Sequence, residues 1–111
     1  MAAYVPPLRD LAFLLHDVFA VQDSPIPGYA DLDRDFTAAV LDEGGKLASE
    51  VLAPVNSAGD REGCRLENGV VRTPKGFKEA YKQFAEGGWT GITCDPEFGG
   101  QGLPATVGFA L

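Results

Sequence analysis

The glycine-rich stretch at residues 95–104, DPEFGGQGLP, is the part of the sequence that could bind a phosphate. Gly100, Gly102 and Ala105 match the G-x-G-x-x-A spacing of a dinucleotide-binding loop, and residues 92–94 could form the strand that precedes such a loop. That motif also needs an acidic residue about 20 positions downstream, whereas Ala105 lies six positions before Leu111. The spacing alone therefore does not predict a nucleotide site.

The same stretch is better explained as a rigid corner that begins a helix. Pro96 fixes a turn, and the glycines permit positive φ angles or a close approach of two backbone segments. Pro104 suits the first position of a helix, where its missing amide is tolerated, but an anion would need that amide. We expect the corner to aim the following helix rather than to bind a ligand.

Side chains with acid–base or nucleophilic chemistry are isolated from one another along the sequence. Glu97 has no partner for acid–base catalysis nearby in the sequence, so we interpret it as a solvated loop acid. His16 and Asp17 are adjacent on an expected helix and so do not face each other, which places His16 at the helix surface or edge. Cys64 and Cys94 lack the flanking base of an activated nucleophile. The sequence predicts no catalytic residue, no cofactor-binding residue and no metal ligand, and leaves substrate-binding residues unknown.

Four aromatic residues could form a ligand-binding wall. Phe77, Tyr81 and Phe84 recur every three or four positions, and Trp89 follows shortly after. This spacing is also what the buried face of a helix requires, and we favour that interpretation over a binding wall.

Composition describes an ordinary globular chain of 111 residues, 45% hydrophobic and 23% charged. That length suits a single domain with one core. A net charge of −7 disfavours binding to nucleic acid or to an anionic membrane. No apolar run has the length of a membrane span, and the apolar residues 11–15 lack the flanking pattern of a signal peptide. We expect a cytoplasmic protein with Cys64 and Cys94 reduced, although one disulfide stays open as an alternative.

The first half of the sequence predicts two helices. Leu8, Leu11 and Leu15, with Val18 or Phe19, form a stripe that indicates a helix over about residues 7–19. A proline-rich irregular loop should follow at residues 23–32. The longest helix should begin at Asp33 as its cap and end at Pro54. Its expected apolar face comprises Phe36, Val40, Leu47, Val51 and Leu52. Gly44-Gly45 within it costs about 1–2 kcal/mol relative to alanines, which predicts close packing or a bend there.

The second half predicts a hairpin and two more helices. Asn68-Gly69 between short apolar segments is a hairpin signal. The next helix should start with Thr73 as cap and Pro74 at the first position, and should end at Gly87-Gly88. After the glycine corner, residues 106–111 (TVGFAL) begin a helix of about two turns, which is marginal alone. We expect this helix to continue in a longer protein.

The sequence of residues 77–104, FKEAYKQFAEGGWTGITCDPEFGGQGLP, resembles the N-terminal helical domain of the acyl-CoA dehydrogenases, in which a P-E-aromatic-G-G-x-G corner leads into a long helix. Residues 4–19 (YVPPLRDLAFLLHDVF) and 53–77 resemble a subgroup of larger members with an extra N-terminal segment. The resemblance covers essentially the whole chain.

This resemblance implies an FAD enzyme that introduces an α,β double bond into an acyl-CoA thioester, usually passing electrons to an electron-transfer flavoprotein. In that family the catalytic base lies in the C-terminal domain and most flavin contacts lie in the middle domain. No catalytic, flavin or CoA residue is therefore carried over to this chain, and the fragment alone should bind no FAD. The family implies a homo-oligomeric parent enzyme of fatty acid metabolism.

We thus predict an all-α orthogonal helical domain with a minor hairpin near Asn68-Gly69. Residues 1–32 would be an N-terminal extension with one short helix. Residues 33–111 would be the helical N-terminal domain of the dehydrogenase, truncated within its last helix, and would help to wall the acyl pocket. The alternative is a free-standing helical module that binds a protein partner through an exposed apolar face.

Overall fold

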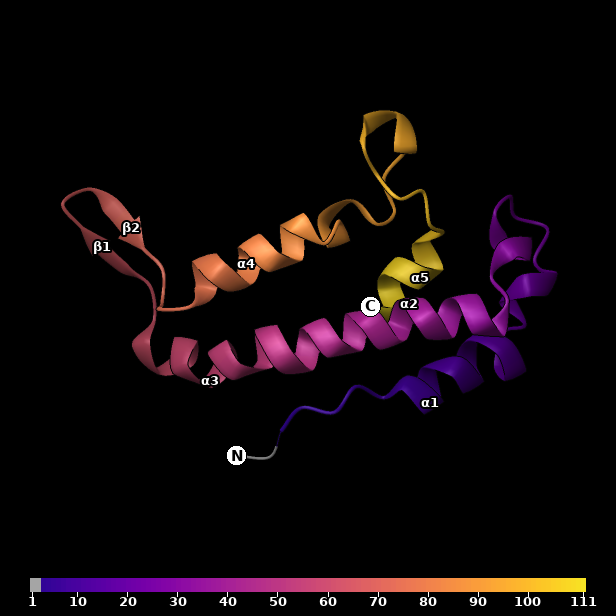
Figure 1. The fold of residues 1–111 in the computed structure, drawn as a ribbon, viewed down its shortest axis with the longest axis horizontal. Coiled ribbons are helices and arrows are strands. Elements are labelled where there is room, and N and C mark those ends of the chain that lie inside the picture. The colour runs from indigo at the N-terminus through magenta and orange to yellow at the C-terminus, as the bar shows by residue number, and fades with distance from the viewer. Residues whose placement is uncertain (1–2) are drawn as a thin grey trace.

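The computed structural model describes residues 3–111 and is predominantly helical (Figure 1). The regular elements, in chain order, are α1 (Leu8–Ala12), α2 (Arg34–Leu47), α3 (Ala53–Glu62), β1 (Arg65–Glu67), β2 (Val70–Arg72), α4 (Phe77–Glu86) and α5 (Ala105–Ala110). Wide π-helical turns at Phe13–Val18 and Ala48–Leu52 continue α1 and α2, and short 3-10 turns lie in the loops. The predicted all-α class with one minor hairpin is confirmed.

The first helix matches its prediction closely, because α1 and the wide turn after it together span residues 8–18. Leu15 is buried, and Leu8 and Leu11 pack against the core. Val18 and Phe19, expected to extend the apolar stripe, are instead exposed. The stripe therefore joins the core through its three leucines.

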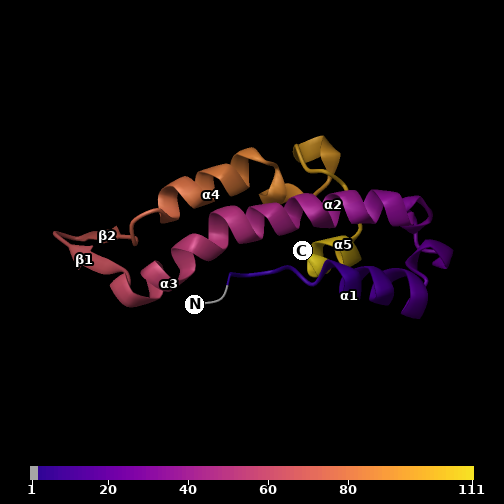
Figure 2. The ribbon, with the colours of Figure 1, turned by 60° about the horizontal axis from the view of Figure 1, so that its bottom comes forward.

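The longest helix begins as predicted but does not end at Pro54. The Asp33 carboxylate accepts a 2.8 Å hydrogen bond from the Phe36 amide and caps α2. The helical path then continues through the turn at Ala48–Leu52 into α3 and ends at Glu62 (Figures 1 and 2). Proline normally breaks a helix because its ring clashes with the carbonyl four residues earlier. Here the wider π turn directly precedes Pro54, which lies in the first turn of α3, where its missing amide is tolerated.

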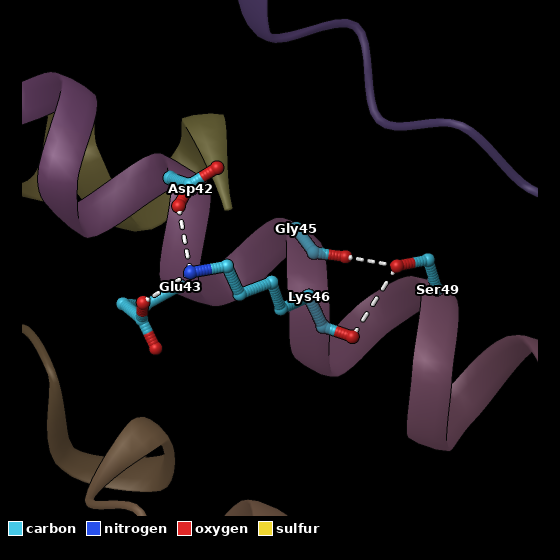
Figure 3. Close-up of polar contacts among 5 residues, drawn as sticks. All are labelled: Asp42, Glu43, Gly45, Lys46 and Ser49. Carbon is cyan, nitrogen blue, oxygen red and sulfur yellow. Dashed lines mark hydrogen bonds and ion pairs between the residues drawn. The ribbon is translucent and has the colours of Figure 1, made fainter.

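Ser49 marks the junction between α2 and the wide turn (Figure 3). Its hydroxyl donates to the carbonyl oxygen of Gly45 at 2.8 Å and lies 3.3 Å from that of Lys46. A serine that bonds back to a carbonyl four residues earlier competes with the backbone ladder and often bends a helix. This contact is consistent with the change of helical pitch at Ala48.

The long helix buries a face other than the one predicted. Thr37, Leu41 and Gly45 are its buried residues, and the face they form lies toward α1. Phe36 and Leu52, expected on the buried face, are exposed. The prediction considered only the larger side chains of the helix, whereas the close approach of Pro6 and Leu8 requires a small residue, Gly45, at the contact.

One hydrophobic cluster joins distant parts of the chain. Its buried members are Leu15, Val21, Leu32, Leu41 and Val107, with Leu32 and Val107 each only 1% exposed. These residues come from both sides of the expected boundary between residues 32 and 33. The N-terminal segment, α2 and α5 therefore share a single core.

The hairpin prediction is confirmed, and the predicted start of the next helix is wrong. Strands β1 and β2 pair antiparallel with Leu66 opposite Val71, and Asn68 and Gly69 both have positive φ, as a tight hairpin turn requires. Thr73 does not cap α4; the helix begins at Phe77, after Gly76 in the left-handed region at φ 90°. Its end at Gly87-Gly88 is as predicted.

The molecule is flat, measuring 54 × 37 × 17 Å. The helical path of α2 and α3 runs along the longest dimension, with α1 on one side and α4 on the other, while α5 lies beside α2 (Figures 1 and 2). A helix with its side chains is about 10–12 Å across, so the shortest dimension holds fewer than two helices. Most helices therefore keep a solvent-exposed side.

Gly45 provides a test of this packing. Its added Cβ atom would lie 2.8 Å from Pro6, so Gly45→Leu should lower the free energy of unfolding by about 1–3 kcal/mol although leucine is the better helix former. Chemical denaturation followed by circular dichroism measures the change. Ala38→Leu, at an exposed position of the same helix, is the matched control and should not destabilise. Equal stability of the two variants would contradict the close packing.

Candidate functional site

The glycine corner uses its backbone amides internally. The Glu97 amide donates to the Asp95 carboxylate at 2.8 Å, and the amides of Phe98 and Gly100 donate to the Asp95 carbonyl at 3.0 and 3.1 Å. Those of Gly99, Gln101, Gly102 and Leu103 also donate to backbone carbonyls. A phosphate-binding loop must point several free amides at its ligand. Every amide from 97 to 103 is engaged within the corner, so the phosphate-cradle interpretation does not hold.

Three of these bonds clamp the two sides of the corner together. Gln101 donates to the carbonyl of Gly91 at 2.9 Å, Gly102 to that of Cys94 at 2.9 Å, and Leu103 to that of Ile92 at 3.0 Å. Residues 92–94, considered above as a strand, form a turn instead. Because the clamp ends immediately before Pro104, it fixes the point and direction from which α5 departs.

Adjacent glycines serve this corner for different reasons. Gly99 has φ 86° and open space around its missing Cβ, so it supplies only a left-handed conformation. Gly100 has an ordinary φ, but a Cβ there would collide with the Cys94 carbonyl oxygen. That backbone atom is held by the clamp and cannot move aside as a flexible side chain could.

The candidate catalytic residues considered in the sequence do not assemble into a site. Glu97 is exposed. His16 Nε2 lies 2.7 Å from the hydroxyl of buried Thr37, while Asp17 pairs with Arg34 at 2.6 Å. Neighbours in sequence, His16 and Asp17 thus contact different residues of α2, as helical geometry predicts. Cys64 and Cys94 are exposed free thiols.

The aromatic residues of α4 line a groove rather than the core, which corrects the prediction. Ala80 is the buried residue of α4, and Tyr81 is 65% exposed. The groove, of about 350 Å³, lies between α4 and the helical path of α3, and its lining is Leu52, Val55, Asn56, Phe77, Ala80, Tyr81 and Phe84. The Phe77 ring packs against Gly59 of α3, where any larger residue would collide with it. Gly59 is visible in the sequence, but helical periodicity could not show that an aromatic ring packs there.

Trp89 takes part in a second groove, of about 540 Å³, between α2 and the glycine corner. Phe36 and Val40 contribute from α2, and Ile92, Gln101 and Leu103 from the corner. Sequence reasoning missed this groove because its two walls lie about fifty residues apart. Glu43 at its margin is the acidic residue of the lining.

Lys46 has a raised pKa (Figure 3). The principal cause is its 2.7 Å hydrogen bond to Glu43, followed by the 2.9 Å contact with Asp42. A lysine pKa raised by folding contributes stability below the unfolded-state pKa, and the contribution is lost as pH rises through the folded-state pKa. The pH range in which this contribution is lost is strongly alkaline. Lys46 therefore stays protonated near neutral pH and is unsuited to act as a base.

The outer side of α5 is strongly apolar and open. Phe109 is 91% exposed, and Ala105 precedes it by one helical turn. Together with Gly108, Ile92 and Thr93 they line a shallow depression. Phe98 at the tip of the corner is also exposed, at 84%. Contiguous exposed apolar surface marks interaction sites, so this side of α5 is a candidate contact surface.

Over residues 3–111, no helix is long and apolar enough to cross a membrane. Among the same residues, no group of three histidine, cysteine or acidic side chains is arranged to hold a metal ion.

Comparison with known proteins relates the chain to the acyl-CoA dehydrogenases, which confirms the sequence resemblance. No family model matches the sequence. The chain is 40% identical over 108 residues to 3-methylmercaptopropionyl-CoA dehydrogenase of Ruegeria pomeroyi, covering 96% of this chain and 18% of that protein. It is 30% identical over 114 residues to the broad-specificity linear acyl-CoA dehydrogenase FadE5 of Mycobacterium tuberculosis, covering 100% of this chain and 19% of that protein. The chain thus spans less than a fifth of the length of these relatives.

The two glycines of the corner make a paired prediction. Gly99→Ala should cost about 1–2 kcal/mol of unfolding free energy, the penalty for a left-handed alanine. Gly100→Ala should cost more, about 3 kcal/mol or above, because the clash with a clamped carbonyl forces the corner open. Urea denaturation of both variants gives the comparison. A Gly100→Ala variant no less stable than Gly99→Ala would mean that the clamp is not rigid.

Proposed function

We propose that the chain is the N-terminal helical part of an FAD-dependent acyl-CoA dehydrogenase, called the parent enzyme below. Residues 1–32 would be its N-terminal extension, and residues 33–111 the first part of its helical domain. The observation that carries this proposal is the pattern of similarity: the two relatives match 96% and 100% of the chain but only 18% and 19% of their own length. An active enzyme of this class would need the remaining length.

The proposed role of this part is to close one side of the acyl pocket. The glycine corner departs into α5, whose outer side presents Phe109 and Ala105. An apolar wall excludes water, which protects a reduced cofactor and strengthens the electrostatic interactions at the thioester. The rigid clamp suits this role because it sets the direction of the wall.

The chain's residues do not fit a site for FAD, the cofactor implied for the parent enzyme. The glycine loop that resembles a phosphate cradle has its amides engaged in the corner, and Lys46 is held by Asp42 and Glu43. In the proposed enzyme, flavin and catalytic base would belong to the middle and C-terminal domains.

The parent enzyme would dehydrogenate an acyl-CoA thioester between the α and β carbons. Its electrons would pass to an electron-transfer flavoprotein, and it would be a homo-oligomer in the cytoplasm. These properties are what the resemblance to the acyl-CoA dehydrogenases implies for the parent enzyme. Within this chain, the proposed partners are the middle and C-terminal domains of the same polypeptide.

The alternative is a free-standing helical interaction module. The two open apolar grooves support it, because such grooves accept helices of protein partners. The similarity to one part of much longer enzymes favours the dehydrogenase.

The gene of the parent enzyme tests the proposal directly. If codons for several hundred residues follow residue 111, their purified product should carry a flavin absorption spectrum and should reduce an artificial electron acceptor with acyl-CoA. The 111-residue chain, purified in parallel, is the matched control and should do neither. A stop codon after residue 111, or a full-length product without flavin, would contradict the proposal.

Exposed apolar surface gives a second test. The 111-residue chain should bind a hydrophobic fluorescent dye through surfaces such as the outer side of α5. The full-length enzyme should bind less dye per molecule, because its other domains would cover these surfaces. Phe109→Ser should reduce the signal of the short chain without changing its circular dichroism. Equal dye binding by the short chain and the full-length enzyme would contradict the proposed role, because the other domains would then leave these surfaces uncovered.

A further inference from the structure

Helix α5 has one side in the core and the other in solvent. Val107 is buried in the cluster with Leu32 and Leu41, and Ala110 packs against that cluster. Phe109 lies on the opposite, exposed side. The rotation of α5 about its own axis is therefore set by the contacts that its inner side makes with these neighbours.

Tyr29 provides a polar contact that fixes this rotation. Its hydroxyl lies 2.7 Å from the hydroxyl of Thr106, and the two residues are partly buried and 77 positions apart. Thr106 adjoins Val107, so the hydrogen bond holds α5 beside its buried residue. Among residues 3–111, it is the single side-chain hydrogen bond that joins α5 to another part of the chain. Apolar packing is non-directional, whereas a hydrogen bond is directional and specifies one orientation.

Tyr29 is itself held firmly. Its amide donates to the carbonyl of Ile26 at 3.1 Å, and its carbonyl accepts from the amide of Leu32 at 3.0 Å. Its ring packs against the hydrophobic cluster, in which Leu32 is also buried. The adjacent Gly28 lies beside the Pro104 ring, at the start of α5. The N-terminal segment therefore presents the Tyr29 hydroxyl from a fixed turn.

We propose that Tyr29 is a positioning residue for binding of the acyl chain: by holding Thr106, it orients α5 so that Ala105 and Phe109 face the acyl group. This inference rests on the proposed function. It also gives residues 1–32 a specific role, since they would set the shape of the pocket without contacting the substrate.

The test uses the full-length enzyme and three variants. Tyr29→Phe removes the hydroxyl and keeps the ring, so the fold should persist, while KM for acyl-CoA should rise about three- to tenfold with kcat changing less than about twofold, as expected for loss of one hydrogen bond. Thr106→Val should raise KM similarly, and the double variant should be no worse than either single variant. Tyr4→Phe is the matched control, because it removes an exposed hydroxyl from the same N-terminal segment and should leave KM unchanged.

Each outcome separates the two proposals. A purely structural role for Tyr29 would lower the melting temperature and the yield but leave KM of the folded enzyme unchanged, which would overturn the inference. Additive effects of Tyr29→Phe and Thr106→Val on KM would also overturn it, because the two residues would then act independently. A wild-type enzyme without flavin or acyl-CoA activity would instead remove the proposed function itself.

Discussion

The burial of Val107 in one cluster with Leu15, Leu32 and Leu41 is the constraint on which the arrangement of the chain depends. It joins the N-terminal segment, the long helix and the last helix. The glycine corner contributes the second half of this constraint. Its three backbone bonds deliver α5 from a fixed point, and the cluster then captures the helix. The exposed side of α5 follows from these two interactions together with the Tyr29–Thr106 hydrogen bond.

The elements that the sequence predicts well are those set by local chemistry. Asp33 as a cap, Asn68-Gly69 as a hairpin and Gly87-Gly88 as a helix end each depend on backbone preferences within a few residues. The family resemblance was read partly from the equally local glycine corner, and comparison over the whole chain confirms the resemblance. Backbone preferences were enough to predict these caps and turns because no contact with a distant part of the chain overrides them.

Predictions failed where tertiary contacts or a change of helical pitch decided the outcome. Pro54 did not stop the long helix because a wider turn precedes it, and proline is tolerated at the start of the segment that follows. Thr73 did not cap α4, since Gly76 directs the chain into the helix three residues later. Tyr81 has the spacing of a core residue, yet in so flat a molecule no second layer covers it. Periodicity identifies an apolar face without showing whether anything packs against it, so the grooves of the candidate site were beyond its reach.

The long sequence separation within the core has a consequence for synthesis on the ribosome. The contacts between α1 and α2 are local and can form once about half of this chain has emerged, because helical neighbours close in sequence associate rapidly. The cluster cannot be completed until Val107 emerges, near the end of the 111 residues. Until then, Leu32 and Leu41 lack part of their packing, and the nascent chain exposes apolar surface of the kind that chaperones protect. The emergence of α5, which the glycine corner brings back onto the first helices, completes the packing of Leu32 and Leu41.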